Sequence, residues 1–211
     1  MQVSIKWLKD YIDFTETPEE LAEKLTMAGV PVENITTLGQ NVENVVAGKI
    51  LKIDKHPNAD RLSVCQIDVG KEILTIVTGA TNVKENDIVP VALVGAKLPG
   101  GIKITKSKLR GVESSGMLCS VEELDLDKKM LEPEVCEGIF LLPPETELGV
   151  DVKTILGLDD VILEFELTAN RADCFSVMGL VREIAVLRGK EFKKPEISVS
   201  ESGKNATDLI E

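Results

Sequence analysis

Four basic residues lie close together in this sequence, and their side chains are suited to binding phosphate. They are Lys103, Lys106, Lys108 and Arg110. Lys and Arg donate charge-assisted hydrogen bonds to phosphate oxygens. If this run is an extended strand, Lys106, Lys108 and Arg110 point to the same side, because side chains alternate along a strand. The pattern predicts an anion-binding strand face, although it is also typical of an ordinary solvated face.

Polar residues outside this run extend the candidate site toward that of an oligonucleotide. The hydroxyl groups of Ser114 and Ser115 can donate hydrogen bonds to phosphate or ribose oxygens. The amide of Asn82 offers both a donor and an acceptor to a base or sugar edge. The predicted nucleic-acid-binding residues are Arg61, Asn82, Lys103, Lys106, Lys108, Arg110, Ser114 and Ser115.

The elements that must position these side chains are short strands. Runs rich in Val, Ile and Leu cover Leu62–Val69, Glu72–Val77 and Ile88–Val94, and each is followed by Gly, Asn or Asp. Such runs are typical of strands separated by turns. Five or so short strands with no long helix between the first four favour a small closed barrel, best matched by an OB-fold. One face of an OB-fold and its bordering loops bind oligonucleotides.

No side chains form a recognisable catalytic or metal-binding arrangement. The single histidine, His56, precedes Pro57 in a predicted turn, and no nucleophile-base pair can be inferred. The sequence contains no Gly-Lys-Ser or Gly-Lys-Thr phosphate loop. The four cysteines include no Cys-x-x-Cys pair, and the acidic residues at 122–127 lack calcium-loop spacing. We expect no catalytic residue, no metal site and reduced cysteines, and a solvated helix and loop at the acidic residues.

Asn170, Arg171 and Asp173 also admit a catalytic interpretation, because a guanidinium, a carboxylate and an amide together can orient a substrate. A structural role is favoured. The aspartate can cap the helix that follows, and Asn170 can close a turn. Arg171 is expected to pair with Glu164 or Glu166.

The N-terminal flank predicts two helices followed by an extended segment at residues 32–38. Ile5, Leu8 and Ile12 recur at helical spacing, with Trp7 on the adjacent stripe. Trp7 is therefore expected in the core rather than as a base-stacking platform. The second helix should begin with a capping box formed by Thr17 and Glu20.

The C-terminal flank predicts one strand and one helix. Val161–Leu167 alternates between apolar and polar residues, and Ser176–Arg188 carries an apolar stripe that ends at Gly189. Each flank is too small to hold a core alone. The expected fold class is α+β, with an OB-fold β-barrel inserted into a small discontinuous α/β domain. The expected domains are 1–39 plus 151–195, the barrel at 40–150, and a tail or the start of a next domain at 196–211.

The charge of the chain is unevenly distributed. The net charge is -12, yet Val45–Gly111 carries 11 Lys and Arg against 6 Asp and Glu. The next segment, Val112–Val150, carries 2 against 10. A basic segment between acidic neighbours is compatible with a local phosphate site of modest affinity. No apolar run approaches the roughly 20 residues needed to span a bilayer, so a cytoplasmic protein is expected.

Three motifs follow one another in the basic segment and its border. They are His56-Pro57-Asn58-Ala59-Asp60-Arg61-Leu62, then Thr78-Gly79-Ala80-Thr81-Asn82, then Leu109-Arg110-Gly111 with Ser114-Ser115-Gly116-Met117-Leu118-Cys119-Ser120. This order resembles the tRNA-binding OB domain of several synthetases and free tRNA-binding proteins. Thr78 stands where Cys is common in that family, a small change. The flanking stretches 4–12 and 168–176 resemble the N-terminal part of the bacterial phenylalanyl-tRNA synthetase beta chain, so that the resemblance covers Met1 to about Lys190.

The resemblance implies a tRNA-binding and structural segment of a cytoplasmic enzyme with two alpha and two beta chains. That enzyme joins phenylalanine to its tRNA with ATP and magnesium, and its aminoacylation site is on the alpha chain. The implied partners are tRNA and the alpha subunit, with no cofactor bound by this segment, no DNA and no membrane. A free-standing tRNA-binding protein and a protein-protein interaction module are the alternatives.

Overall fold

The chain divides into two compact units. A computed structural model describes residues 1–200, 203 and 207, so most of the expected tail beyond residue 200 lies outside the described residues. Unit 1 comprises Met1–Thr36 together with Val161 and the residues after it, and unit 2 comprises Thr37–Asp160. Residues 151–160, which the sequence pattern placed with the flanks, group with unit 2. Among the described residues, none of the helices combines the length and the apolar character needed to cross a membrane.

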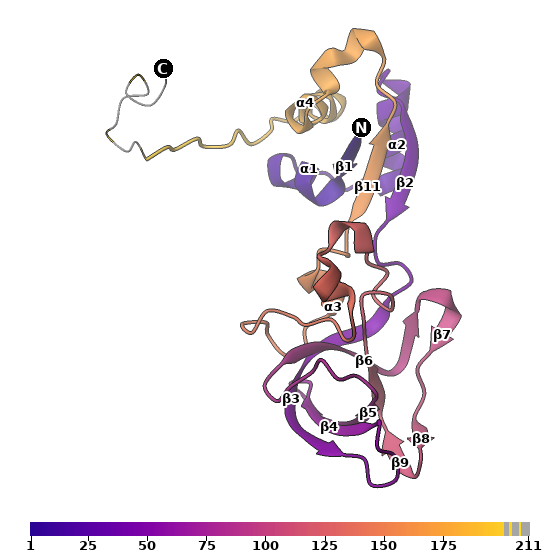
Figure 1. Cartoon of the computed structure of the whole chain (residues 1–211). Coiled ribbons are helices and arrows are strands. Elements are labelled where there is room, and N and C mark those ends of the chain that lie inside the picture. Colours follow the sequence, from indigo (N-terminus) through magenta and orange to yellow (C-terminus); the bar gives the residue numbers. More distant parts are fainter. Residues whose placement is uncertain (201–202, 204–206, 208–211) are drawn as a thin grey trace. The chain divides into compact units, whose positions relative to one another are not determined.

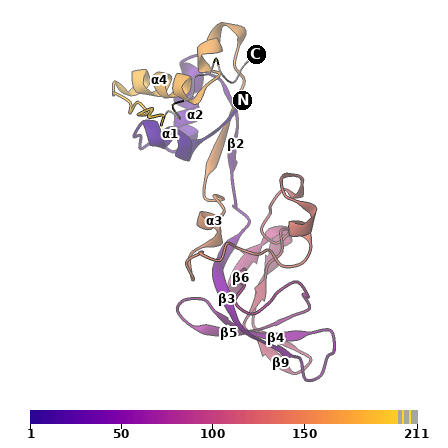
Figure 2. The ribbon, with the colours of Figure 1, turned by 60° about the vertical axis from the view of Figure 1, so that its left-hand side comes forward.

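Unit 1 contains a three-stranded sheet in the order β1-β11-β2, with helices beside it (Figures 1 and 2). Its elements are β1 (Gln2–Ser4), α1 (Ile5–Tyr11), α2 (Pro18–Met27), β2 (Val32–Thr37), β11 (Val161–Phe165), the 3-10 helix η4 (Ala169–Cys174) and α4 (Val177–Arg188). Strands β1 and β11 are antiparallel, although more than 150 residues separate them in the sequence.

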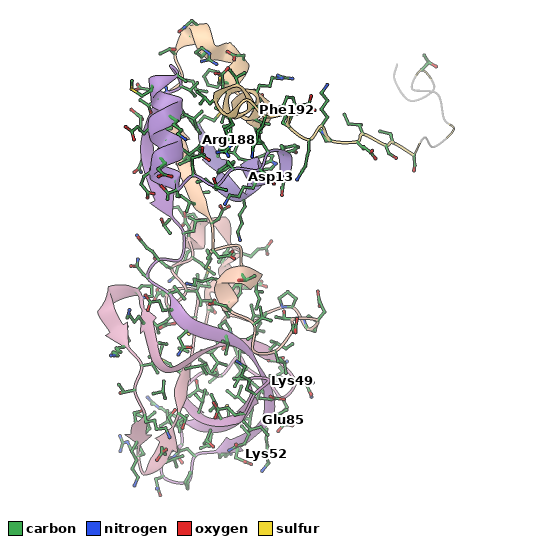
Figure 3. All side chains as sticks on the ribbon, turned by 180° about the vertical axis from the view of Figure 1, so that it is seen from behind. Asp13, Lys49, Lys52, Glu85, Arg188 and Phe192 are labelled. Carbon is green, nitrogen blue, oxygen red and sulfur yellow. The ribbon has the colours of Figure 1, made fainter. Side chains whose placement is uncertain are left out.

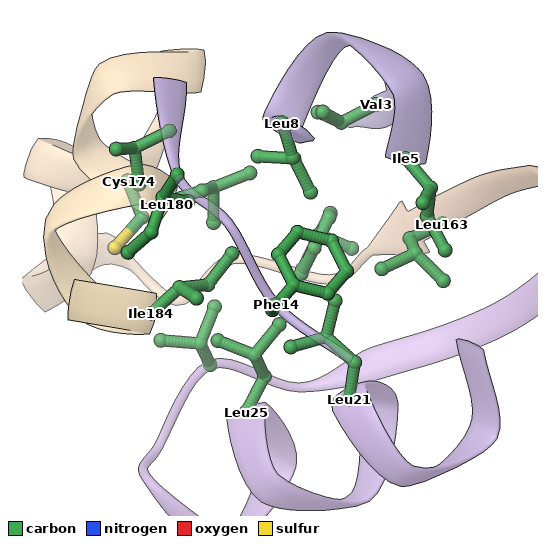
Figure 4. Close-up of a cluster of buried hydrophobic side chains, with 14 of the residues drawn as sticks. Val3, Ile5, Leu8, Phe14, Leu21, Leu25, Leu163, Cys174, Leu180 and Ile184 are labelled. Carbon is green, nitrogen blue, oxygen red and sulfur yellow. The ribbon is translucent and has the colours of Figure 1, made fainter. Parts of the chain in front are cut away.

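The core of unit 1 combines side chains from both flanks of the sequence. Leu8 and Leu25 come from the first flank, and Leu163 and Ile184 come from the second (Figure 4). All four are fully buried. Neither flank could bury these side chains alone, so the two segments are stabilised by packing on each other.

The capping residues of α2 and α4 are those that the sequence predicts, but the predicted burial of Trp7 is not observed. Thr17 and Glu20 form the capping box of α2. Ser176 caps α4, and Gly189 ends it in the left-handed conformation. The prediction for Trp7 was wrong, because this side chain is 50% exposed. Two adjacent apolar stripes on α1 were available, and the core takes only the one that carries Leu8.

Unit 2 is built on a six-stranded, mostly antiparallel sheet in the order β10-β6-β3-β4-β5, with β7 pairing to β6, and a separate hairpin of β8 and β9 (Figure 1). Its strands are β3 (Glu43–Lys55), β4 (Ser63–Asp68), β5 (Ile73–Thr78), β6 (Ile88–Leu98), β7 (Ile102–Lys103), β8 (Ser107–Leu109), β9 (Val112–Ser114) and β10 (Gly116–Leu118). Its helical elements are α3 (Val152–Ile155) and the 3-10 turns η1 (Pro99–Gly101), η2 (Lys128–Met130) and η3 (Pro133–Cys136).

The sheet of unit 2 is strongly curved, but its strand pairing does not close. Strands β10 and β5 are the two ends of the pairing order, joined by a backbone hydrogen bond from Ser115 N–H to the Thr75 carbonyl of 2.9 Å. The fold is therefore mixed α/β with an open, OB-like sheet, and the expected closed barrel is not confirmed. Two strands are also longer than expected, since β3 has 13 residues and β6 has 11.

Strand β3 packs closely against the side chains of its neighbouring strands at Gly48. A Cβ atom at this position would lie 2.7 Å from Val91 Cγ2 and 2.8 Å from Ile67 Cγ2. Figure 3 shows Lys49 and Lys52 along the same strand. Glycine thus lets β3 approach the apolar side chains of its neighbours.

The acidic segment that follows β10 contains turns and irregular structure. The helix expected there does not form, and the buried side chains of Val121 and Leu124 hold the segment on the core. Residues 139–143 return to the sheet through a bridge between Ile88 and Leu142, in which Leu142 N–H donates to the Ile88 carbonyl at 2.8 Å.

The two ends of unit 2 lie next to each other. Leu38 N–H donates a hydrogen bond of 2.9 Å to the Asp160 carbonyl. Unit 2 therefore begins and ends at one place, where the chain passes to and from the two segments of unit 1.

Candidate nucleic-acid interface

The basic run does not form one continuous strand. Its first part ends in β7 at Lys103, the buried Ile104 follows, and a new strand starts at Ser107. Arg110 has a φ of +47°, in the left-handed region, because it lies in the turn between β8 and β9. The prediction that Lys106, Lys108 and Arg110 share one strand face was therefore wrong, since alternation holds only within a strand.

Within the hairpin, Lys108 of β8 lies opposite Glu113 of β9. Glu113 forms its ion pair diagonally, with Lys106 Nζ at 3.6 Å. Both side chains of this pair are about two-thirds exposed, so the pair contributes little to stability and can open at little cost when an anion arrives.

The first sequence motif holds the turn of the third motif. Nε2 of the buried His56 donates to the Leu109 carbonyl at 3.0 Å, and the Asn58 amide donates to the Arg110 carbonyl at 3.2 Å. Nδ1 of His56 accepts from Asn58 N–H at 3.1 Å, which fixes the tautomer with hydrogen on Nε2. Gly111, with a φ of +101°, completes the turn beside the Asn58 amide. This network fixes the backbone at Arg110 and therefore the point from which its side chain extends.

Two predicted binding residues are structural. Ser114 is 1% exposed, and its Oγ accepts from Val77 N–H at 3.1 Å and donates to the Gly116 carbonyl at 3.0 Å. The Asn82 amide donates to the Ile139 carbonyl at 2.8 Å and accepts from its N–H at 3.0 Å. The predicted ligand contacts of Ser114 and Asn82 are not supported, because these polar groups stabilise loops and strands of unit 2.

The structure brings the remaining candidates to three hollows of the surface, except Lys108, which is exposed on β8 outside these linings. The first, which we call the groove, has a volume of about 370 Å³ and lies between the end of β5, residues 103–105 and strands β8 to β10. Lys103 lines it, with the hydroxyl groups of Thr78, Thr105 and Ser107. Sequence reasoning missed these three hydroxyls, although Thr78 belongs to the second motif.

The second hollow, about 420 Å³, is formed by the first motif and the turn residue Arg110. We call it the arginine hollow, and its lining residues are Asn58, Ala59, Asp60, Arg61, Leu62 and Arg110. The third hollow, about 410 Å³, contains Lys106 and Ser115. The sequence could not reveal this division of the candidates among three hollows, because it depends on the turn at Arg110.

Four of the candidate cations are available to an external anion. Arg61, Lys103, Lys108 and Arg110 are exposed, and no carboxylate of the described residues lies within ion-pair distance of them. Unit 2 contains a single Phe, Tyr or Trp, namely Phe140, which is 9% exposed. The interface therefore offers charge and hydroxyl groups, without an aromatic platform on which a base can stack.

The cluster around Arg171 in unit 1 is a structural clamp. Arg171 pairs with Asp173 at 3.1 Å and with Glu183 at 2.7 Å, which corrects the expected pairing with Glu164 or Glu166. Its hydrogen bond keeps the pKa of Asp173 below the usual range. Asp173, Cys174 and Glu183 have possible metal-ligand atoms within 4.8 Å of one another, but the guanidinium already pairs with both carboxylates.

The cysteines have no disulfide partner. Cys65, Cys119 and Cys174 are buried, and Cys136 is half-buried. Burial raises the pKa of Cys119 to about 12 and that of Cys174 to about 11, so both thiols are protonated near neutral pH.

Comparison with known proteins identifies relatives of the whole chain. Residues 45–149 match the family described as "Putative tRNA binding domain". The chain is 50% identical over 213 aligned residues to the phenylalanine–tRNA ligase beta subunit of Clostridium acetobutylicum, covering 100% of this chain and 26% of the relative. It is 50% identical to that of Moorella thermoacetica, covering 99% and 26%. The chain thus spans about a quarter of the length of the curated relatives it matches.

Solved structures add only a weak similarity. The "MetRS related protein from Pyrococcus horikoshii" aligns with a TM-score of 0.36 at 23% identity, covering 50% of this chain and 84% of that one. This score is too low to carry a structural argument. The matched family lies within unit 2, where the three hollows are, while the identity to the ligase subunits includes unit 1. On this evidence residues 45–149 match the tRNA binding domain family, and the chain is similar along its whole length to the N-terminal part of bacterial phenylalanine–tRNA ligase beta subunits.

Proposed function

We propose that this chain is the tRNA-binding N-terminal part of a phenylalanine–tRNA ligase beta subunit, and that unit 2 makes the tRNA contact. The observation that carries the proposal is that the family match and the cations without carboxylate partners fall in the same segment. The family match at residues 45–149 covers the segment in which Arg61, Lys103, Lys108 and Arg110 have no carboxylate partner in the described part of the chain. Exposed cations without a carboxylate partner are available to the phosphates of a polyanion.

The contacts are proposed to be mainly with phosphate and ribose. Lys103 lines the groove, and Lys106 and Ser115 line the third hollow. Lys108 is exposed on β8, between two residues that line the groove. Base stacking on aromatic rings contributes about 1–3 kcal/mol per base in other single-strand binders. Unit 2 lacks an exposed ring, so its affinity must come from the nucleic-acid backbone.

The rest of the enzyme would supply the chemistry. In this proposal the alpha subunit is the partner and carries the aminoacylation site, two alpha and two beta chains assemble in the cytoplasm, and ATP with magnesium serves the whole enzyme. This segment binds no cofactor and has no catalytic residue. A free-standing tRNA-binding protein is less well supported, because the identity to the ligase subunits extends over both units.

The domain arrangement belongs to the same proposal. Unit 2 is an OB-type barrel whose closure is completed between β5 and β10, and it is inserted into the discontinuous unit 1. The hydrogen bond from Ser115 to Thr75 supports closure. The hydrogen bond from Leu38 to Asp160, together with the mixed core of unit 1, supports insertion.

The test is a titration of a tRNA transcript into the 211-residue chain at several salt concentrations. The proposal expects log affinity to fall linearly with log salt, with a slope of about 0.7–0.9 for each phosphate contacted. Replacing Lys103, Lys106 and Lys108 together by Gln should reduce that slope by roughly 2 to 3 if each contacts a phosphate.

The matched control replaces Lys71 and Lys84 by Gln, because both are exposed cations of unit 2 that line none of the three hollows. This control should leave the slope unchanged. Failure of the unmodified chain to bind tRNA any better than heparin-like polyanions would contradict the proposed function.

A further inference from the structure

We infer that the arginine hollow is a subsite for one internal phosphodiester of the RNA backbone, and that His56 and Asn58 are positioning residues for it. This inference rests on the proposed function and deepens it, since it names the ligand group and the residues that hold it. Arg61 and Arg110 line the same hollow of about 420 Å³. Both are exposed, and neither has a carboxylate within ion-pair distance among the described residues.

The chemistry of the hollow fits a phosphate. A guanidinium presents a planar fork of N–H groups that matches two oxygens of a phosphate, and two such forks can bind one group from two sides. The lining contains no aromatic ring and only one side chain of pure hydrocarbon beyond alanine, Leu62. A base or an apolar side chain would therefore find little surface to pack on.

The charge of the hollow suits an internal phosphodiester. Asp60 also lines it, so two guanidinium groups and one carboxylate leave a formal charge of +1. An internal phosphodiester carries a single negative charge, which would neutralise the hollow.

The position of Arg110 is built into the fold. Its φ of +47° is uncommon for a residue other than glycine, and the turn is held by the bonds from His56 to the Leu109 carbonyl and from Asn58 to the Arg110 carbonyl. The same motif that supplies these bonds continues into Asp60 and Arg61. The loop of the first motif therefore provides the side of the hollow that carries Arg61, and it also holds the turn that carries Arg110.

The experiment uses the whole 211-residue chain and a tRNA transcript, with the variants Arg61→Gln, Arg110→Gln and the double variant. If both arginines contact one phosphate, each single variant should lower the salt slope by up to about 0.7–0.9, and the double variant should lower it by no more than that. Losses that add up to about twice this value would mean two separate phosphates and would overturn the shared subsite.

The control Lys71→Gln with Lys84→Gln removes the same charge from another part of unit 2 and should not change the slope. Asp60→Asn should tighten tRNA binding, because it removes the repulsive charge from the hollow. Asn58→Ala should weaken binding in the unmodified chain and should have no further effect in the Arg110→Gln variant. An equal loss in both backgrounds would show that Asn58 acts on binding independently of Arg110 and would overturn its positioning role.

The outcomes separate this inference from the proposed function. If the Lys103, Lys106 and Lys108 triple variant loses tRNA while both arginine variants bind like the unmodified chain, the subsite is wrong and the function stands. If the unmodified chain does not bind tRNA, the function itself is wrong.

Discussion

The buried ion pair between Glu16 and Arg188 should stabilise unit 1 in a way that depends on pH. These residues come from opposite ends of the sequence, and their side chains are only 9% and 16% exposed. Figure 3 shows Arg188 in the same region as Asp13 and Phe192. A hydrogen bond from Lys24 at 2.8 Å, then a backbone hydrogen bond and the charges of Arg188 and Lys24, outweigh the effect of burial and lower the pKa of Glu16 from 4.5 to about 2.

This pKa sets the expected magnitude and sign. The difference from the ordinary value corresponds to about 3 kcal/mol of unfolding free energy. Because the folded pKa is depressed, this contribution is complete above about pH 4.5 and is lost as pH falls toward about 2. Replacing Glu16 by Gln should therefore cost about 3 kcal/mol at pH 7 and clearly less at pH 3.

Urea unfolding of both proteins at pH 7 and pH 3, followed by far-UV circular dichroism, measures this difference. Asp13→Asn is the matched control, since Asp13 also joins the two ends of the chain by pairing with Lys193, but both of these side chains are mostly exposed. Its loss should cost less than about 0.5 kcal/mol. A Glu16→Gln penalty below about 1 kcal/mol at pH 7, or one that is the same at pH 3, would refute the reasoning.

Three further changes test other parts of the structure. Asn82→Ala removes two hydrogen bonds to Ile139 and should lower the unfolding free energy of unit 2 by about 2 kcal/mol in urea titrations, and a change under about 0.5 kcal/mol would contradict the structural role. Gly48→Ala places a methyl group 2.7 Å from Val91 and should lower the thermal midpoint, whereas an unchanged midpoint would show that the sheet can open there. Glu33→Gln should raise the midpoint at pH 7 and low salt, because the hydrogen bond and charge of Glu166 raise the pKa of Glu33 and ionising it opposes folding. That gain should shrink in high salt, and its persistence there would exclude charge repulsion as the cause.

Structural features set by residues close in the sequence could be predicted, whereas features set by distant residues could not. The capping box at Thr17 depends on residues three positions apart, so the spacing alone predicts it. The burial of Ser114 depends on Val77, 37 residues away, which no local pattern encodes. The turn at Arg110 interrupted a run that looked like a strand because the bonds from His56 and Asn58 hold its backbone. The candidate surface could therefore be predicted only as a segment, while the position of each side chain required the fold.

The hydrogen bond between Leu38 and Asp160 has a consequence for the order of folding. Unit 1 must bring together two segments separated by roughly 120 residues, and closing so long a flexible loop costs about 4 kcal/mol of chain entropy. Once unit 2 has folded, that loop is replaced by a compact body whose two ends are already adjacent. The contacts within unit 2 then offset most of the entropy that is lost when this loop is closed. During synthesis on the ribosome, unit 2 is also complete before β11 and α4 emerge, so a folded unit 2 would act as the template that lets the two halves of unit 1 meet.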